Sequence, residues 1–376
     1  MKFVVSSTEL LNHLTAISRV ISSKSTLPIL DNFLFNLEDN KLTITASDLE
    51  TTMITWIDLE NAEGIGEVAI TAKLLIDTLK EFPEQPLTFQ ISNEKYTVDI
   101  FSENGKFSVA GQSGEEYPEV PQIHAANATG VSMNPEALLS GISKTLFATA
   151  DDELRPVMNG ILFEISPEEA TFVASDAHKL VRYKRNDVKA EIDSSFILPK
   201  KPAALLKNLL PKEDFAVKLE FDEKNAFFGL SKYKVICRLV EGKYPSYNSV
   251  IPTNNPNKMQ IDRLELYNTL RRVSVFSNQA SNLVRLKITG NQLVVSAQDL
   301  DYSISAVERL NCNYEGDEME IGFKSSFLLE ILSNLPSGEI RLELSDPSRA
   351  GILLPAEKES DEEDILMLLM PMMINS

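Results

Sequence analysis

The sequence TASDLE at residues 45–50 recurs twice further along the chain, as ASDAH at residues 174–178 and as AQDLD at residues 297–301. The aspartates of the three stretches lie 128 and 123 residues apart. Each stretch follows a short run of alternating apolar and polar residues, which is the pattern of a half-buried strand. A long period of this kind indicates a repeated structural unit, and it has to be found before any shorter motif is interpreted.

Other landmarks keep the same period and the same order. They are the leucines of a helical pattern at Leu10, Leu138 and Leu266, and the prolines that stop a second helical pattern at Pro83, Pro211 and Pro336. We therefore predict an α+β protein of three homologous domains, each with two helices and about eight strands in antiparallel sheets. The predicted domains are residues 1–124, 125–253 and 254–376.

Apolar spacing of three to four residues predicts six helices, and the period-two runs between them predict strands. The helices are expected at residues 8–21, 72–82, 134–147, 199–210, 262–276 and 323–335. Near the C-terminus, residues 356–364 are expected to form a solvated acidic loop. Residues 366–374 (LMLLMPMMI) read either as a buried edge strand or as a methionine-rich lining for varied peptides.

Composition narrows the class of protein. The 376 residues carry a net charge of −19, which taken alone argues against nucleic acid or an anionic membrane as a partner. Only two cysteines are present, so a reducing, cytoplasmic setting is expected. The longest apolar run, residues 365–370, is far shorter than the ~20 residues of a membrane-spanning helix.

Motifs for catalysis are weak. Asp176 and His178 could form a metal site or a general base, and this enzyme hypothesis remains the alternative from another class. The three histidines and two cysteines complete no ligand set, and no phosphate-binding glycine loop is present, so we expect neither metal nor cofactor. Asp48 and Asp299 occupy the equivalent positions without a neighbouring histidine. A turn whose aspartate bonds to its own backbone is therefore the favoured interpretation.

Charge is distributed unevenly along the chain. The six predicted helices hold 11 basic and 7 acidic residues, whereas the remainder holds 25 basic and 48 acidic residues. Ordinary solvated helix faces would explain this distribution. So would a basic helix layer in an acidic shell, which would contact phosphates without reading bases and would bind more weakly as salt rises.

Several stretches together resemble the bacterial sliding clamp family, the beta subunit of DNA polymerase III. The resemblance runs from end to end, through MKF at the N-terminus and residues 26–30, 45–50, 159–160, 175–180, 240–250, 320–323 and 370–372. It implies a DNA-clamp fold and a closed ring made by a head-to-tail homodimer. Such a ring encircles double-stranded DNA without sequence preference and is a non-catalytic processivity factor. A three-domain scaffold that binds no DNA is the other alternative.

The resemblance also implies site residues. The dimer contact would involve Phe107, Val109, Val275 and Phe276. DNA would face Lys24, Lys73, Lys80, Lys144, Lys200, Lys201, Lys207, Arg271 and Arg272. A peptide groove would be lined by Arg155, Met158, Ser175, Ala177, His178, Lys179, Leu180, Pro245, Ser249, Val250, Leu368, Met370, Pro371, Met372 and Met373.

The groove's expected partners are the DNA polymerase III alpha subunit, the clamp loader and other proteins that carry a clamp-binding motif. Three residues depart from the family pattern. Ala177 stands where glycine is common, and Ser249 and Met373 stand where arginine is often found. Because these positions line the groove, they bear on which peptides it prefers.

Overall fold

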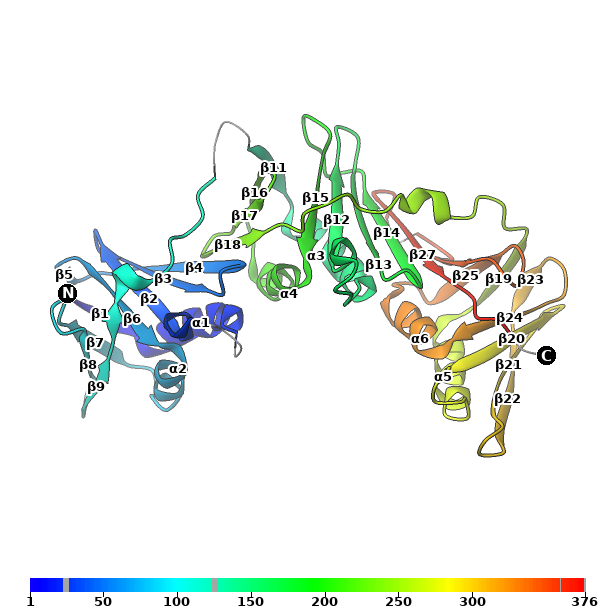
Figure 1. The fold of residues 1–376 in the computed structure, drawn as a ribbon, viewed down its shortest axis with the longest axis horizontal. Helices are drawn as coiled ribbons and strands as arrows, with labels where there is room; N and C mark the ends of the chain where they lie inside the picture. Colours follow the sequence, from blue (N-terminus) through cyan, green and yellow to red (C-terminus); the bar gives the residue numbers. More distant parts are fainter. Residues whose placement is uncertain (23–26, 124–127, 359, 375–376) are drawn as a thin grey trace. The chain divides into compact units, whose positions relative to one another are not determined.

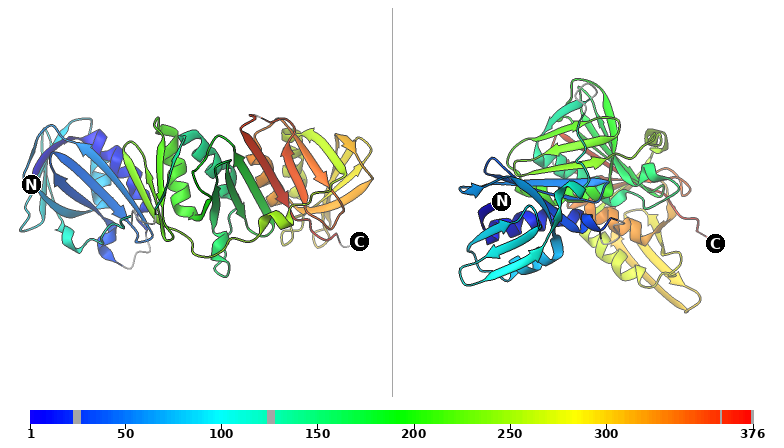
Figure 2. Two further views of the ribbon diagram at one scale, coloured as in Figure 1. Left: turned by 90° about the horizontal axis from the view of Figure 1, so that it is seen from above. Right: turned by 60° about the vertical axis from the view of Figure 1, so that its left-hand side comes forward.

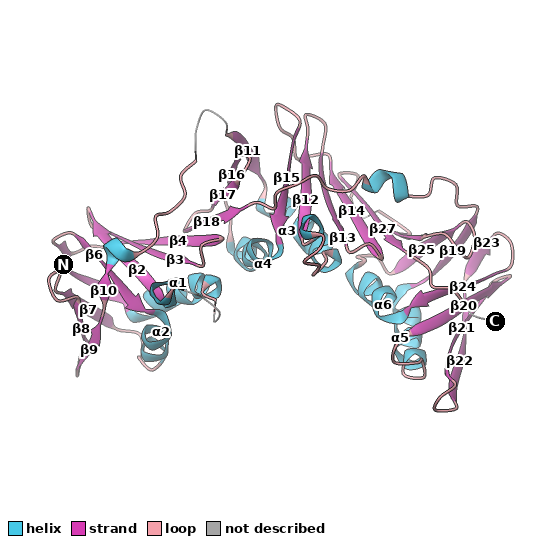
Figure 3. Ribbon diagram, viewed as in Figure 1, coloured by secondary structure: helices cyan, strands magenta, loops and turns pink. Residues whose placement is uncertain are grey.

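The computed structural model describes residues 1–22, 27–123, 128–358 and 360–374 (Figure 1). The chain forms two compact units, which are described separately. The first comprises Met1–Glu136 with Lys201–Leu239, and the second comprises Ala137–Lys200 with Val240–Ser376. Helices and antiparallel sheets are mixed in both units, so the predicted α+β class is confirmed (Figure 3).

The first unit contains two sheets with helices packed on them. Helix α1 contacts the strands β1, β3 and β4, whereas α2 contacts β2 and β6. Between the sheets, the ring of Phe89 stacks on Phe3 at 5.0 Å and lies 6.4 Å from Phe35. The strands of the nine-stranded sheet are, in order, β10 (Gln112–Ser113), β6 (Gly66–Thr71), β2 (Asn32–Glu38), β3 (Lys41–Ser47), β4 (Thr51–Asp58), β18 (Tyr233–Arg238), β17 (Asn225–Gly229), β16 (Val217–Phe221) and β11 (Thr129–Met133). The strands of the five-stranded sheet are, in order, β5 (Ala62–Glu63), β1 (Lys2–Ser6), β7 (Pro86–Ile91), β8 (Thr97–Phe101) and β9 (Lys106–Ala110). The helices are α1 (Ser7–Ile17), α2 (Ala72–Lys80) and α4 (Lys200–Leu209).

The second unit has a nine-stranded and a four-stranded sheet. The strands of the nine-stranded sheet are, in order, β15 (Ser194–Pro199), β12 (Gly160–Ile165), β13 (Ala170–Ser175), β14 (Lys179–Arg185), β27 (Glu363–Leu369), β26 (Gly351–Pro355), β25 (Glu339–Leu344), β19 (Asn257–Asp262) and β23 (Asn313–Glu315). The strands of the four-stranded sheet are, in order, β22 (Ile304–Asn311), β21 (Gln292–Asp299), β20 (Leu283–Thr289) and β24 (Met319–Lys324). The helices are α3 (Pro135–Thr145), α5 (Arg263–Ser274) and α6 (Ser325–Asn334). Figure 2 shows these strands from two further directions.

Both nine-stranded sheets run across the ends of sequence repeats. In the first unit, β4 of the first repeat pairs with β18 of the second, and in the second unit β14 of the second repeat pairs with β27 of the third. We call these two pairings the internal joints. They explain why three sequence repeats form two compact units, because each joint makes one continuous sheet out of strands from two neighbouring repeats.

Local sequence accounts for the ends of several elements. Helix α1 begins after Ser6, whose hydroxyl accepts a hydrogen bond from the backbone N–H of Glu9, and α5 begins after Asp262, which caps it in the same way. Asp39 and Asn40 have φ values of 49° and 60°, as a two-residue hairpin turn requires. The predicted helix over residues 8–21 is one turn too long, because a 3-10 turn replaces it from Ser18.

Two predictions at the C-terminus are wrong. Strand β27 is not at an edge, since it pairs with β14 on one side and β26 on the other. The acidic run is not wholly a solvated loop, because Glu363 and Asp364 belong to β27 and Glu363 is bonded to Lys144 and Arg185. Over the described ranges, no helix is long and apolar enough to cross a membrane.

Candidate functional site

The three repeated aspartates form the predicted turns. The Oδ1 atom of Asp48 accepts the backbone N–H groups of residues 50 and 51, and Asp176 accepts those of residues 178 and 179 at 2.9 and 2.8 Å. Asp299 accepts those of residues 301 and 302. Leu49 and Ala177 follow with φ near 75°, but the third copy of the turn is two residues longer. The repeated motif is therefore structural.

In the second unit, the middle turn is tied to helix α6 by Lys179. Its ammonium group lies 2.8 Å from Asp176 and 3.0 Å from Glu330, and 4.5 Å from the centre of the Phe327 ring. The ring of His178 stacks on the same Phe327 at 5.7 Å. The side chain of Lys179 is therefore buried in an ion cluster. It is not exposed at the surface where a bound peptide could contact it.

A cluster of buried apolar side chains lies beside this turn. Two rows of opposed strand residues form it: Ile197, Leu162 and Val173 on neighbouring strands, and Leu180, Leu368 and Ile352 on the next three. Tyr244, Tyr247, Ala350 and Leu366 complete one continuous cluster with them, and Val157, Val240, Ile251 and Leu354 pack against it half-exposed. We call this cluster the apolar floor.

Other predicted groove residues adjoin members of the apolar floor along the chain. The 3-10 turn η8 (Tyr247–Val250) carries Ser249 and the exposed Val250, and Pro245 precedes it. After β27 the chain continues through Met370, Pro371, Met372 and Met373, where Met372 forms an isolated bridge with Gly322 and Met373 is 84% exposed. Among them, Val250, Met370 and Met373 offer exposed apolar side chains.

Arg155 and Met158 differ in how accessible their side chains are to a partner. The guanidinium of Arg155 is exposed and is held by Asp152 at 2.8 Å, whereas Met158 is buried. Arg155, Asp152 and His178 line a polar hollow of about 420 Å³, together with Lys200 and Glu330. Ser175 is buried and donates its hydroxyl to the carbonyl of Lys179, so it stabilises the turn.

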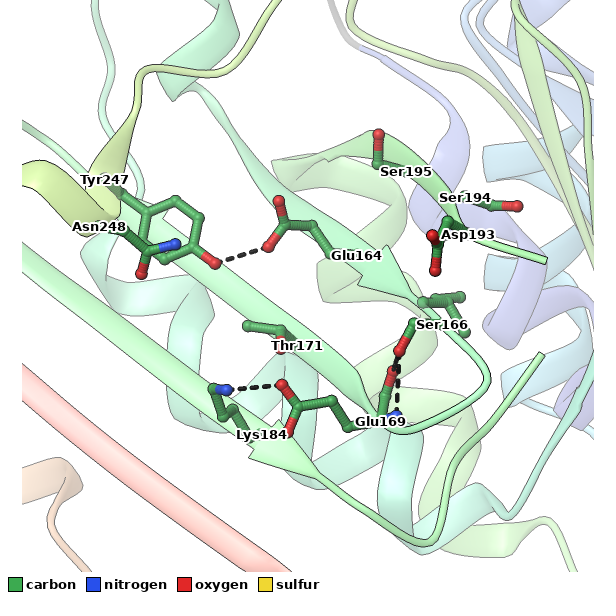
Figure 4. A pocket seen from close by; sticks show the side chains of 11 residues that line it. Glu164, Ser166, Glu169, Thr171, Lys184, Asp193, Ser194, Ser195, Tyr247 and Asn248 are labelled. Atoms are coloured by element: carbon green, nitrogen blue, oxygen red, sulfur yellow. Dashed lines mark hydrogen bonds and ion pairs between the residues drawn. The ribbon is translucent and has the colours of Figure 1, made fainter. Parts of the chain in front are cut away.

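A second polar hollow, of about 490 Å³, is lined in part by Tyr247 and Asn248 of η8. Figure 4 shows the hydroxyl of Tyr247 pointing to Glu164, to which it donates a hydrogen bond of 2.6 Å, and Lys184 pointing to Glu169. Burial and the neighbouring carboxylate raise the pKa of Tyr247, so the phenol stays protonated and η8 stays anchored. Tyr247 therefore fixes one side of the apolar floor.

Chemically, this region can bind but shows no catalytic constellation. Within the described residues, no group of three or more His, Cys, Asp and Glu side chains could hold a metal ion. The apolar floor and the methionines beside it can accept apolar side chains of different shapes, because thioethers are flexible and polarizable. The arrangement fits a short peptide better than a reacting substrate.

The predicted DNA-facing residues fall into two groups. Five are held by protein partners: Lys80 by Asp77, Lys144 by Glu363, Lys200 by Asp151, Lys201 by Asp48 and the carbonyl of Val20, and Arg272 by Glu308. Lys73, Lys207 and Arg271 are exposed and form no ion pair with another described residue. Lys24 lies outside the described residues. Lys144 is the least available, since its side chain is only 16% exposed.

The predicted dimer residues are partly exposed apolar side chains. Phe107 and Val109 lie on β9, the edge strand of the five-stranded sheet. Val275 and Phe276 follow helix α5 and are 72% and 38% exposed. These two pairs belong to different units, so each is a separate surface of the chain.

Sequence reasoning missed most of the apolar floor and one exposed edge. Leu162, Val173, Ile197 and Ile352 read as ordinary strand residues, and only strand register reveals that they share a face. Ile304 and Val307 on the edge strand β22 are 39% and 57% exposed. They lie three residues apart, so their side chains point to opposite faces of β22, and the sequence shows no alternating apolar pattern that could have indicated an exposed face.

Comparisons with known proteins extend over nearly the whole chain. Residues 1–121 match the N-terminal domain of the DNA polymerase III beta subunit, residues 132–246 its central domain and residues 248–373 its C-terminal domain. The chain belongs to the family of the bacterial beta sliding clamps. The beta sliding clamp of Haemophilus influenzae is 29% identical over 375 residues, 99% of this chain and all of the relative.

Two further relatives agree. The beta sliding clamp of Vibrio cholerae serotype O1 is 26% identical over 372 residues, 99% of both chains. The crystal structure of the DNA polymerase III subunit beta from Pseudomonas aeruginosa covers all of both chains with a TM-score of 0.93 and 26% identity. Membership of the clamp family makes this chain a DNA sliding clamp, a non-catalytic processivity factor of DNA polymerase III, so the enzyme alternative is set aside. DNA and a polymerase are among the clamp family's partners, and its members dimerise.

Proposed function

We propose that two copies of the chain join head to tail into a closed ring around double-stranded DNA, and that the apolar floor is the base of a groove for partner peptides. The expected partners of the groove are the polymerase alpha subunit, the clamp loader and other proteins with a clamp-binding motif. In this ring, the three domains 1–124, 125–253 and 254–376 of each copy provide six equivalent sectors. The setting is the bacterial cytoplasm.

The apolar floor is the observation that supports the groove. It joins Leu180 and Leu368 to strands on either side, and Val250 and Met370 remain exposed beside it. The apolar floor itself is buried, so the side chains that a partner would meet first are the exposed Val250, Met370 and Met373. Ser249 and Met373 add no charge to it, so we expect affinity to depend on apolar anchors and only weakly on salt.

Replacing Val250 with Glu tests the groove. A carboxylate beside the apolar floor opposes the burial of an apolar anchor, so the Kd for a fluorescein-labelled C-terminal peptide of the polymerase alpha subunit should rise at least about tenfold. Fluorescence polarisation measures this Kd. Leu264→Glu is the matched control, because Leu264 on α5 is 54% exposed and Val250 is 53% exposed. Equal Kd values for the two variants would move the peptide site elsewhere.

Lys73, Lys80, Lys200, Lys207, Arg271 and Arg272 are the proposed DNA-facing set among the described residues, and Lys24 remains in it by resemblance. Lys144 and Lys201 are left out because the side chain of Lys144 is only 16% exposed and Lys201 is held by two partners, Asp48 and the carbonyl of Val20. Lys80, Lys200 and Arg272 stay in the set, because each pairs with one carboxylate only. Loose contact between long cationic side chains and phosphates carries no sequence information. It would let DNA move through the ring.

Retention on circular DNA tests the ring. After loading onto a nicked plasmid by a clamp loader, the protein should co-elute with the circle in gel filtration and leave it when one restriction cut linearises the plasmid. A topological link predicts this loss, because a free end lets the ring slide off. A scaffold that binds no DNA would elute alone in both cases, and an ordinary DNA-binding protein would remain on both forms.

A further inference from the structure

The first unit holds a large hollow between helix α1 on one side and, on the other, the end of α4 with the 3-10 turn η7 (Leu210–Lys212). The turn between β17 and β18, at residues 230–233, bounds a third side. We call it the α1–α4 hollow. Its volume is about 1060 Å³, and its lining includes no member of the apolar floor or of the proposed DNA-facing set. Ligand pockets are typically about 300–1,000 Å³ in volume, so it is large enough for a small organic group.

His13 of α1 lines the α1–α4 hollow and is only 5% exposed. Its Nδ1 atom is hydrogen bonded to the hydroxyl of Thr55, and that hydroxyl donates its single proton to the carbonyl of Lys232 at 2.9 Å. The oxygen of Thr55 must therefore accept from Nδ1, so the neutral imidazole carries its proton on Nδ1. Its other nitrogen, Nε2, is then an acceptor without a proton.

This Nε2 atom is open to a ligand. Burial lowers the pKa of His13, and the charge of Lys232 lowers it further, so the imidazole is neutral at pH 7. Thr55 does not line the hollow, so the hollow meets the rest of the ring, and Nε2 is not sealed from solvent. Among the described residues, Nε2 has no hydrogen-bond partner. A ligand that supplies a donor would satisfy an acceptor that the fold leaves unpaired.

Aromatic and aliphatic side chains form most of the surface around His13. The ring of Tyr233 lies 5.6 Å from the imidazole, so two rings form the base of the hollow. Phe215 also lines it and is 70% exposed. The aliphatic side chains of the walls are Leu11, Ala16, Leu205, Leu209 and Leu230. A flat apolar group would bury this surface and could stack against the rings.

The charges around the hollow balance one another. The charged lining residues that form no ion pair with another described residue are Arg19, Lys212, Lys232, Glu9, Glu84 and Asp214. One more carboxylate, that of Glu213, is already used, because its two oxygens accept the backbone N–H groups of Phe215 and Ser231. Three cations and three carboxylates remain, so neither an anion nor a cation is strongly attracted.

The surroundings of Nε2 select a neutral ligand. The charge of Lys232 acts on His13 and would repel a cation at the same place. A carboxylate or a phosphate dianion offers only acceptors, which cannot bond to a bare Nε2. A neutral group with one donor and an apolar body meets both conditions. An indole is such a group, because its N–H is a donor and the ring has no acceptor to leave unpaired.

We propose that the α1–α4 hollow binds a flat heteroaromatic ring with one N–H donor, such as an indole, and that this N–H donates to Nε2 of His13. The ring lies against Tyr233 and Phe215, among the aliphatic side chains of the walls. Two sources carry this chemistry, a free small molecule and a tryptophan side chain of another protein.

A set of probe ligands tests the hydrogen bond without altering the protein. Indole and N-methylindole share one ring system, but the methyl group removes the donor. The Kd for N-methylindole should be at least about tenfold higher than the Kd for indole, because Nε2 is then left unpaired. Skatole, which carries the methyl group on carbon and keeps the N–H, is the size-matched control and should bind as indole does.

Saturation-transfer NMR titrations of the full chain measure these constants. Equal Kd values for indole and N-methylindole would overturn the hydrogen bond to His13. Failure of indole to bind at all would overturn the site.

Two variants locate the ligand. His13→Phe keeps a ring but removes Nε2, so indole should bind it no better than N-methylindole. Because this change also removes the bond to Thr55, Phe215→Ala is the second variant, and it should raise the Kd for indole at least about threefold. Ile65→Ala is its matched control, since Ile65 is also 70% exposed but does not line the hollow, and it should leave the Kd unchanged. Equal effects of Phe215→Ala and Ile65→Ala would overturn the location.

The apolar floor is the competing place for an indole. Val250→Glu should leave the Kd for indole unchanged, and a rise in that variant with none in Phe215→Ala would overturn the inference by placing the ligand there. N-acetyltryptophanamide identifies the source. If it binds with a Kd close to that of indole, the site accepts a tryptophan side chain of a protein, and if only indole binds, the site takes a small molecule. Both results support the site.

Discussion

The aspartate turn shows how one residue type serves three places differently. Asp48, Asp176 and Asp299 all accept two backbone N–H groups. What differs is the neighbour of the free carboxylate oxygen: Lys201 in the first copy, Lys179 in the second and Asn278 in the third. The first copy of the turn thus stabilises an internal joint, and the second supports the candidate peptide site. The third copy bonds only within its own repeat.

Ala177 carries a conformational cost at the middle turn. Its φ of 74° lies in the left-handed region, which disfavours a side chain with a Cβ atom. Replacing Ala177 with Gly should therefore raise the free energy of unfolding by about 0.5 kcal/mol, after the greater flexibility of glycine in the unfolded chain is subtracted. Urea denaturation at pH 7 measures this change.

Ala174→Gly is the matched control for that prediction. Ala174 lies in the strand β13 and is fully buried, so glycine there should lower the free energy of unfolding by about 1 kcal/mol. If Ala177→Gly were as destabilising as Ala174→Gly, the conformation of the turn would have to be different.

At the scale of elements, strand β27 connects the C-terminal repeat to the central one. Glu363, at its beginning, is bonded to Lys144 of α3 at 2.6 Å and to Arg185 of β14 at 2.8 Å. Lys144 also lies over the ring of Tyr183. Burial alone would raise the pKa of Glu363, but the hydrogen bond and charge of Lys144, with the charge of Arg185, outweigh it and hold that pKa below its ordinary value.

Replacing Lys144 with Met should destabilise the second unit. Methionine keeps the length of the side chain but leaves a half-buried carboxylate with one cation fewer, at a cost of about 3 kcal/mol at neutral pH. A carboxyl whose folded pKa is lowered stabilises the fold above its ordinary pKa and loses this contribution on acidification. The difference between Lys144→Met and the parent should therefore be full at pH 7 and shrink below about pH 4.

Thermal unfolding between pH 3 and pH 7 measures this dependence. Lys287→Met, on an exposed strand position, should change the free energy of unfolding by less than about 0.5 kcal/mol at every pH. A difference for Lys144→Met that is the same at pH 3 and pH 7 would exclude Glu363 as the cause.

Periodic elements could be predicted from the sequence, but the sheet partners could not. The helices and hairpins follow from apolar spacing and from turns such as Asp39–Asn40, and the aspartate turns follow from side-chain chemistry. The position of β27 does not, because a terminal run of apolar residues looks the same at an edge as in the middle of a sheet. Lys144 and Lys179 show a second limit, since a lysine on an amphipathic element gives no indication of a buried carboxylate beside it.

At the scale of the whole molecule, the net charge of −19 opposes contact with DNA, so binding depends on exposed basic side chains that face the phosphates. Lys207→Ala with Arg271→Ala removes two exposed cations from each copy, and four from a dimer. The logarithmic salt slope of DNA binding should fall by up to about 3.6, in proportion to the phosphate contacts that are lost.

Lys144→Gln is the comparison for this prediction, since a lysine already paired with Glu363 should add nothing to the slope. The Kd for a short duplex at several salt concentrations gives both slopes. An unchanged slope for Lys207→Ala with Arg271→Ala would place the DNA contacts on other residues.

The internal joints also determine how the chain can be divided. A fragment cut at residue 124 would expose β4, the strand that otherwise lies against β18. It would still carry the free edge of β9, and so would present two unpaired edge strands. Unpaired edge strands pair readily with strands of other chains, so copies of such a fragment could add to one another without end. Separate expression of one sequence repeat should therefore give open fibres or precipitate, and isotope labelling or crystallisation by parts has to keep β4 and β18 in one fragment.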